Sequence, residues 1–270
     1  MTSAREQENS GRKAQRRRAD RAIAVSQRLL EARLEALYQR DARGRLLCRN
    51  QWDAGDAPRF HLMAGLHGSV CGFGADVPDE IVAGIEQHIR LHTPTPSVQA
   101  KGGWLPRVPT LAAGCVEWLQ TQQRQAEPAW CGPVYRFPHP PIGLGALNAQ
   151  RATVVRVTLQ DVGVLLSEMA DWEADVAHRQ PFFAVVDADG VARAVCASVR
   201  IHPELHEAGI ETVPVAQQRG YALAATTAWA KAVRDLGAEP VYSTSWHNRA
   251  SLAVAGRLGL EQFAVDYWVD

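Results

Sequence analysis

The sequence has no net charge, no long apolar run and no paired-cysteine motif, and each absence excludes a class of protein. Its 29 Lys and Arg residues balance 29 Asp and Glu residues, so no overall field draws the chain to nucleic acid or to a membrane surface. No apolar run is long enough to span a bilayer, and no segment reads as the core of a signal peptide. These absences favour a cytoplasmic protein that binds neither membrane nor nucleic acid.

The cysteines are few, odd in number and scattered. The chain has five of them and no C-x-x-C pair: Cys48, Cys71, Cys115, Cys131 and Cys196. This favours reduced thiols in a cytoplasm over a disulfide framework or a zinc site. His202 and His206 are four residues apart, but Pro203 follows the first and no third ligand is evident. We therefore expect no metal.

Composition and length indicate a globular chain of one large or two ordinary domains. Hydrophobic residues make up 46% of the 270 residues and charged residues 21%. Pro and Gly cluster in residues 138–145, which marks the expected domain boundary. We predict a flexible basic N-terminus (1–20), an N-terminal α+β domain of unknown role (21–145) and a C-terminal domain (151–270).

The N-terminal half has sequence patterns that predict helices and strands but no motif that indicates a chemical function. Residues 19–40 have apolar positions at helical spacing, and residues 79–91 and 109–125 are further predicted helices. Short apolar runs at 46–48, 60–66 and 69–73 predict a small antiparallel sheet, with another strand at 132–137. Four tryptophans are expected in a core or interface, the alternative being an acceptor pocket at the domain junction: Trp52, Trp104, Trp118 and Trp130.

The C-terminal half alternates between strand and helix patterns. Strands are expected at 153–159, 181–186, 191–201, 207–213, 241–244 and 263–269. Helices are expected at 161–177, from about 221 to 236, and at 248–258. An Asp-Gly turn at 189–190 joins the second and third strands. The predicted order is β-α-β-β-β-α-β-α-β, in an α+β fold with a mixed central sheet.

The stretch from Glu207 to Ala222 organises this half. Its strand ends at Pro214, which has no N–H group for a sheet ladder. The helix that follows begins with small residues, Gly220 and Ala222. The unpaired N–H groups and the dipole of a helix N-terminus form a binding site for phosphate.

This stretch resembles the acyl-CoA-binding motif of the GCN5-related N-acetyltransferases, the GNAT superfamily. The family pattern Gln/Arg-x-x-Gly-x-Gly/Ala stands here as Gln217, Gly220 and Ala222. A second element at 242–251, followed by a helical run that closes with Leu258-Gly259-Leu260, resembles the family's fifth strand and last helix. The resemblance covers about residues 151–270 and implies a GNAT fold for them.

The resemblance also implies where acetyl-CoA binds. The backbone of Val213 and Val215 would pair with the pantetheine arm, and the amides from Gln218 to Ala222 would hold the pyrophosphate, with Arg219 adding charge. Asn248 would cap the last helix near the arm. The full set of implied cofactor residues is Thr212, Val213, Val215, Gln217, Gln218, Arg219, Gly220, Tyr221, Ala222 and Asn248.

For catalysis, the family commonly uses a carboxylate on the organising strand as the base. Glu207 and Glu211 are the candidates, and strand alternation places both on one face with Gly209 between them. Many members carry a proton-donating Tyr seven residues after the Asn, but this chain has Ala255 there. Ser251 is the candidate substitute, and Ser245, Tyr242, His247 or water are others.

The sequence thus predicts an N-acetyltransferase that moves the acetyl group of acetyl-CoA to a primary amine in a ternary complex. The alternatives are a catalytically inactive acyl-CoA-binding regulatory or structural module, and an RNA-associated protein that uses the basic N-terminus. The acceptor could be a small amine or a peptide. The sequence does not fix the oligomeric state, and a homodimer is one option.

Overall fold

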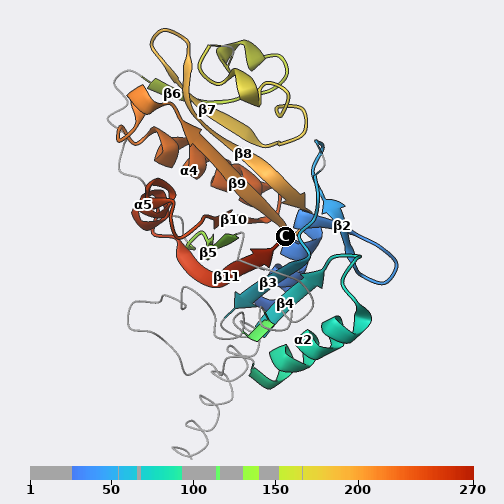
Figure 1. Cartoon of the computed structure of the whole chain (residues 1–270). Helices are drawn as coiled ribbons and strands as arrows, with labels where there is room; N and C mark the ends of the chain where they lie inside the picture. The colour runs from blue at the N-terminus through green and yellow to red at the C-terminus, as the bar shows by residue number, and fades with distance from the viewer. Residues whose placement is uncertain are drawn as a thin grey trace, which may run out of the picture.

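The computed structural model describes residues 26–53, 55–65, 68–92, 114–115, 130–139, 152–165 and 167–270. These ranges form a nine-stranded sheet with helices on both faces and a separate two-stranded sheet (Figure 1). The basic N-terminus and most of the helix predicted at 109–125 lie outside them, although residues 114–115 are helical. No helix within these ranges is both long and apolar enough to cross a membrane.

The large sheet is mixed. Its strand order is β4-β3-β11-β5-β10-β9-β8-β7-β6, in which β9 and β10 are parallel and the other neighbours are antiparallel. The strands are β3 (Phe60–Gly65), β4 (Gly68–Phe73), β5 (Trp130–Arg136), β6 (Ala152–Arg156), β7 (Phe182–Asp187), β8 (Ala192–His202), β9 (Leu205–Thr212), β10 (Glu239–Ser243) and β11 (Glu261–Val269). A mixed sheet flanked by helices confirms the predicted fold class.

The two halves of the chain share this sheet. β5, from before the Pro- and Gly-rich segment, lies between β10 and β11, and β11 also pairs with β3. The prediction of a small separate sheet from residues 46–73 is therefore wrong, because β3 and β4 extend the main sheet. Only β2 (Leu46–Arg49) pairs elsewhere, with β1 (Tyr38–Arg40). The division into domains at 145 stays a prediction.

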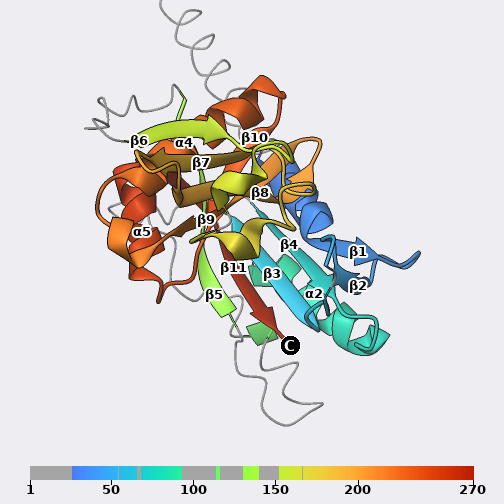
Figure 2. The same ribbon diagram turned by 90° about the horizontal axis from the view of Figure 1, so that it is seen from above.

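Helices cover both faces of the sheet. On one face, α4 (Tyr221–Asp235) and α5 (Arg249–Arg257) pack on β5, β8, β9 and β10, and α2 (Asp79–His92) packs on β3 and β11. On the other face lie the helix of residues 26–37 and the segment of residues 157–178. Figure 2 shows α4 and the segment of residues 157–178 on opposite sides of β7 and β8.

The sequence accounts directly for α4. Its alanines have the highest helix propensity, and seven of its residues are buried. Gly237 ends it with a φ of 84°, while the N–H groups of Gly237 and Ala238 donate to the carbonyls of Arg234 (2.8 Å) and Val233 (3.2 Å). This is the Schellman arrangement, which satisfies the last carbonyls of a helix. The helix is also the crossover that makes β9 and β10 parallel.

The helix predicted at 161–177 is wrong. This segment contains two 3₁₀ turns, η1 (Val162–Leu165) and η2 (Ala170–Trp172), joined by irregular turns. Gly163 lowers helix propensity, and a short helix is costly to nucleate. Burial of Leu165, Met169 and Val176 against β7 and β8 stabilises the turns instead.

Candidate active site

The parallel strands β9 and β10 separate at a defined point. They pair from Glu239 with Leu205 to Val241 with Glu207, and no further pair follows. Beyond that point β10 stays paired with β5 through Tyr242 and Ser243, and β9 stays paired with β8 up to Thr212. The two strands therefore open a gap between Ile210–Thr212 on one side and the end of β10 on the other.

The backbone of β9 offers unpaired groups to this gap. Val213 N donates to Arg193 O of β8 at 3.0 Å, so the residues of β9 whose backbone groups hydrogen-bond to β8 are 213, 211 and 209. In an antiparallel pair, N–H and C=O of one residue point the same way and alternate along the strand. Ile210 and Thr212 therefore direct their backbone groups toward the gap.

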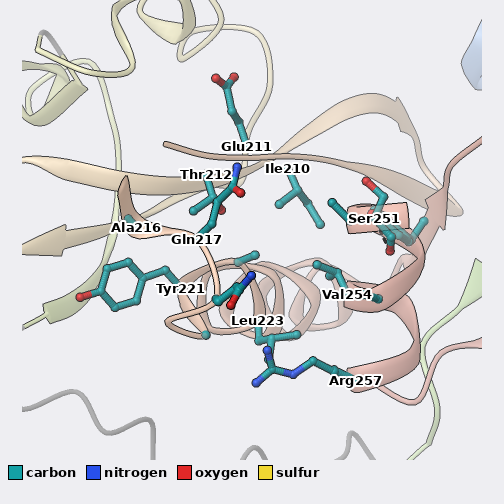
Figure 3. Close-up of a pocket in the computed structure, with 16 residues that line it drawn as sticks. Ile210, Glu211, Thr212, Ala216, Gln217, Tyr221, Leu223, Ser251, Val254 and Arg257 are labelled. Carbon is teal, nitrogen blue, oxygen red and sulfur yellow. Dashed lines mark hydrogen bonds between the residues drawn. The ribbon is translucent and has the colours of Figure 1, made fainter. Parts of the chain in front are cut away.

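A cavity of about 330 Å³ occupies this gap (Figure 3). It lies between the end of β9, the start of α4, Tyr242 of β10 and one face of α5. The α5 side contributes Ala250, Ser251, Ala253, Val254 and Arg257. Thr212 also lines it, and its Oγ1 is buried without a hydrogen-bond partner among the described residues. Such an orphan hydroxyl is costly unless a ligand satisfies it.

The start of α4 presents bare amides to the cavity. Gly220 is the N-cap, with φ of 82°, and Gln218 also has a positive φ, 62°. Ala224 N donates to Gly220 O at 3.1 Å, whereas the N–H groups of Gly220, Tyr221 and Ala222 have no acceptor in the described part of the chain. Gly220, Tyr221 and Ala222 all line the cavity. This geometry suits a phosphate group.

The predicted cofactor residues divide into two sets. Those that line the cavity are Thr212, Gln217, Gln218, Gly220, Tyr221 and Ala222. Those that do not are Val213, Val215, Arg219 and Asn248. Val213 N donates to Arg193 O and Val213 O accepts from Ala216 N at 2.9 Å, so pairing of this N–H group with a pantetheine arm is contradicted. Val215 is 69% exposed.

Asn248 caps α5, as predicted. Its side chain accepts a hydrogen bond from Ser251 N at 3.0 Å. Ser251 lines the cavity, and its carbonyl accepts from Tyr242 Oη at 3.3 Å. Ala255 is buried in the core against α4, so that position offers no proton. The hydroxyls at this end of the cavity are those of Ser251 and Tyr242, and burial raises the pKa of Tyr242 to about 12.

Glu207 is buried and fully engaged. Its Oε2 accepts from Arg33 Nε and its Oε1 from Arg33 Nη2, each at 3.0 Å, and Ser243 Oγ also donates to Oε1. Arg33 comes from the helix of residues 26–37, on the face opposite α4. These contacts join β9, β10 and that helix at the point where the strands separate. The Glu207 carboxylate is therefore engaged in holding these three segments together.

Arg33 also binds Asp266 of β11, whose Oδ2 lies 2.6 Å from Arg33 Nη1. Burial alone would lower the pKa of Arg33, but the charges of Asp266 and Glu207 outweigh it and raise that pKa above its ordinary value. Burial likewise opposes ionisation of Asp266, yet Arg33 and His61 hold its pKa below the ordinary value. The buried arginine is therefore compensated by two carboxylates.

Glu211 shares the Glu207 face of β9 but not its environment. It is exposed, it borders the cavity, and its Oε2 accepts from Trp172 Nε1 at 2.6 Å. In Figure 3 its side chain points away from α4, whereas Ile210 points toward that helix. Of the two predicted carboxylates, this one is accessible to a substrate.

Sequence reasoning missed two contributors to the site. Arg257 lines the cavity, and Arg33 fixes Glu207. Arg33 carried a signal, since it falls on the apolar face of its helix between Leu30 and Leu37, where a charge needs a buried partner. Arg257, in the last turn of α5, carried no signal beyond its favourable place at a helix C-terminus.

Comparison with known proteins found similarity in structure but not in sequence. No family model and no curated protein matches the chain. A GCN5-related N-acetyltransferase from Kribbella flavida is 16% identical, with a TM-score of 0.49, over 91% of this chain and 95% of that chain. An acetyltransferase of the GNAT family from Colwellia psychrerythraea is 11% identical, with a TM-score of 0.46, over 74% and 76%.

A third structure, a putative acetyltransferase of the GNAT family from Novosphingobium aromaticivorans, is 17% identical, with a TM-score of 0.41. That match covers 53% of this chain and 66% of the other. The chain is similar in structure to acetyltransferases of the GNAT family.

Proposed function

We propose that the chain is an N-acetyltransferase that uses acetyl-CoA as co-substrate and a primary amine as acceptor. The observation that carries this proposal is the separation of β9 from β10 beside a helix start with unbonded amides. An extended arm could pair with the backbone of Ile210 and Thr212, and a diphosphate could accept from the amides of Gly220 to Ala222. Arg257 would add a positive charge at the same cavity.

The residues present fit the coenzyme. The orphan hydroxyl of Thr212 and the bare amides are donors without protein acceptors in the described ranges, and both face the cavity. Acetyl-CoA supplies an activated acetyl thioester. The apolar wall of Ile210, Ala253 and Val254 would exclude water from the bound arm.

Glu211 serves as the base in this proposal. The amine nitrogen forms a bond to the acetyl carbon while the carbon–sulfur bond breaks, and the amine proton passes to the Glu211 carboxylate directly or through water. The departing thiolate takes a proton from the hydroxyl of Tyr242 or Ser251 or from water. Trp172 holds the Glu211 side chain in place through its N–H group. Glu207, locked by Arg33, positions the strands instead of moving protons.

Two measurements test the proposal. Titration calorimetry with CoA should show binding, and a thiol-release assay with acetyl-CoA and a panel of amines should show turnover. Binding without turnover across a broad panel would favour the inactive acyl-CoA-binding module. If CoA gives no heat at all, the assignment of the cavity is wrong.

A further inference from the structure

The position of the Glu211 side chain depends on Trp172. Trp172 Nε1 donates to Glu211 Oε2 at 2.6 Å, and among the described residues no other group donates a hydrogen bond to this carboxylate. The indole lies against Gly209, where an added Cβ would be 3.2 Å from Trp172 Cη2. Gly209 stands between Glu207 and Glu211 on β9, so the indole lies on the face of the strand that carries both carboxylates. Whatever fixes Trp172 therefore also fixes the proposed base.

The turn that carries Trp172 does little to hold the indole. η2 contains three residues, and its N-cap, Met169, makes no side-chain hydrogen bond. Such a short 3₁₀ turn gains little stability from its own backbone. The indole instead packs edge-to-face with Phe182 of β7, with ring centres 5.7 Å apart, and the guanidinium carbon of Arg179 lies 5.6 Å from the centre of the Trp172 ring. A guanidinium over an indole is a favourable cation–π contact, so Arg179 helps to set the plane of the ring.

Asp175 in turn holds Arg179. Asp175 Oδ1 lies 2.9 Å from Arg179 Nε, and the backbone N–H group of Arg179 donates to Asp175 O at 2.9 Å. The Asp175 side chain is only 12% exposed, so water screens this ion pair less than it screens a surface pair. The carbonyl of Arg179 also accepts from Ser198 N of β8 at 3.0 Å, which ties this residue to the sheet. Arg179 is therefore fixed through both its backbone and its side chain.

The last member of this network comes from the N-terminal half of the chain. Trp52, in the turn of residues 50–53 that follows β2, donates from Nε1 to Asp175 Oδ1 at 2.7 Å, across 123 residues of sequence. Its ring also stacks on His178, with ring centres 5.0 Å apart. Because Trp52 is 47% exposed, burial of its ring contributes less than it would in a core. The directed hydrogen bond to a buried carboxylate is therefore its distinctive contact.

We infer that Trp52 and Asp175 are positioning residues for Glu211, so that a turn of the N-terminal half completes the active site. This inference rests on the proposed function, in which Glu211 is the base. The contacts run from Trp52 to Asp175 and Arg179, and from Arg179 through Trp172 to Glu211. None of the four residues before Glu211 lines the cavity proposed for the coenzyme. Their loss should therefore lower kcat more than it lowers the affinity for CoA.

The first test observes the network without turnover. The indole N–H resonance of Trp172 is followed in ¹⁵N–¹H NMR spectra of the full chain and is assigned with Trp172→Phe. Glu211→Gln should move this resonance, because the charged acceptor of the hydrogen bond is lost. Trp52→Phe keeps a ring next to His178 but removes the donor to Asp175, and it should move the Trp172 resonance in the same direction.

The second test is kinetic. Trp52→Phe and Asp175→Asn should each lower kcat about 10- to 100-fold by displacing Glu211, while the Kd of CoA should stay within about twofold of the native value. Asp175→Glu, which keeps a carboxylate, should recover part of the lost kcat. Asp53→Asn, at an exposed position of the same turn, is the matched control and should change neither kcat nor the Trp172 resonance.

The two tests separate this inference from the proposed function. If Trp52→Phe leaves the Trp172 resonance at its native position, or if a folded Trp52→Phe chain keeps the native kcat, the inference is overturned. Thermal melting shows whether each variant is folded, and Asp175→Asn provides a second reading if Trp52→Phe is not. If the native chain acetylates no amine, a resonance that moves still supports the placement of Glu211 by Trp52. That failure then belongs to the proposed function alone.

Discussion

The two faces of β9 are built in different ways. On its α4 side, the strand presents apolar side chains such as Ala208 and Ile210, and its unpaired backbone groups point into the gap next to the bare amides of a helix start. On the opposite side, it presents Glu207, held by Arg33 of the helix of residues 26–37, and Glu211, held by Trp172 of the segment of residues 157–178. The first face relies on main-chain geometry and the second on side chains from distant segments. A change of side chain should therefore affect the two faces differently.

The largest effect should come from Glu211 on the charged face. Glu211→Gln removes the proposed base, so kcat should fall about 10²- to 10⁴-fold. The affinity for CoA should change little, because the Glu211 side chain points away from α4 (Figure 3), although its residue borders the cavity. Steady-state kinetics and calorimetry measure the two quantities. Glu173→Gln is an exposed control, and an unchanged kcat for Glu211→Gln would remove this residue from the mechanism.

Arg33→Met tests the buried ion cluster on the same face of β9, which we expect to contribute to stability. The change leaves Glu207 and Asp266 buried without their partner, and the free energy of unfolding should fall by about 3–5 kcal/mol. Urea denaturation measures it. Arg28→Met, which removes an exposed ion pair with Glu204 from the same helix, is the matched control and should change little. Equal losses from both variants would contradict the role assigned to the buried cluster.

Gly220→Ala tests the other side of β9, where the backbone amides at the start of α4 would bind the coenzyme. An L-residue at a φ of 82° costs about 1 kcal/mol of stability, and a shifted backbone would misdirect the amides that bind phosphate. We expect CoA affinity to fall about 10- to 100-fold, the value of one charged hydrogen bond. Gly237→Ala has a similar φ, 84°, and open space at its Cβ. It should cost similar stability and leave CoA binding intact.

The smallest effect concerns His206, which lies on the α4 face. Trp229 Nε1 donates to Ser198 Oγ (3.0 Å), and this hydroxyl lies 2.8 Å from His206 Nδ1. Burial lowers the pKa of His206, so at low pH the unfolded chain binds more protons than the folded chain does. The contribution of neutral, buried His206 to the free energy of folding is fully present above the ordinary pKa of His. It is lost as the pH falls through the lowered pKa of the folded chain. Denaturation at pH 7.5 and 5.5 should show a steeper loss in the native chain than in His206→Asn, and identical slopes would contradict this account.

The helix start at Gly220 could be predicted because it depends on residues that are neighbours in the chain. The succession of strands along the C-terminal half could be predicted for the same reason, because each strand has its own alternation of residues and its own turn signals. The segment of residues 157–178 could not be predicted, because its turns are stabilised by burial against β7 and β8. That burial overrides a weak local preference for helix.

By itself, the sequence determined the part of the site that is made of local backbone: the strand, the turn at Pro214 and the bare amides of α4. Only the tertiary structure decided which carboxylate is accessible. Arg33 is 174 residues from Glu207 and 233 residues from Asp266, and they meet because one sheet joins both halves of the chain. The physical reason is that hydrogen bonds within a turn depend on sequence neighbours, whereas compensation of a buried charge depends on which strands the fold places side by side.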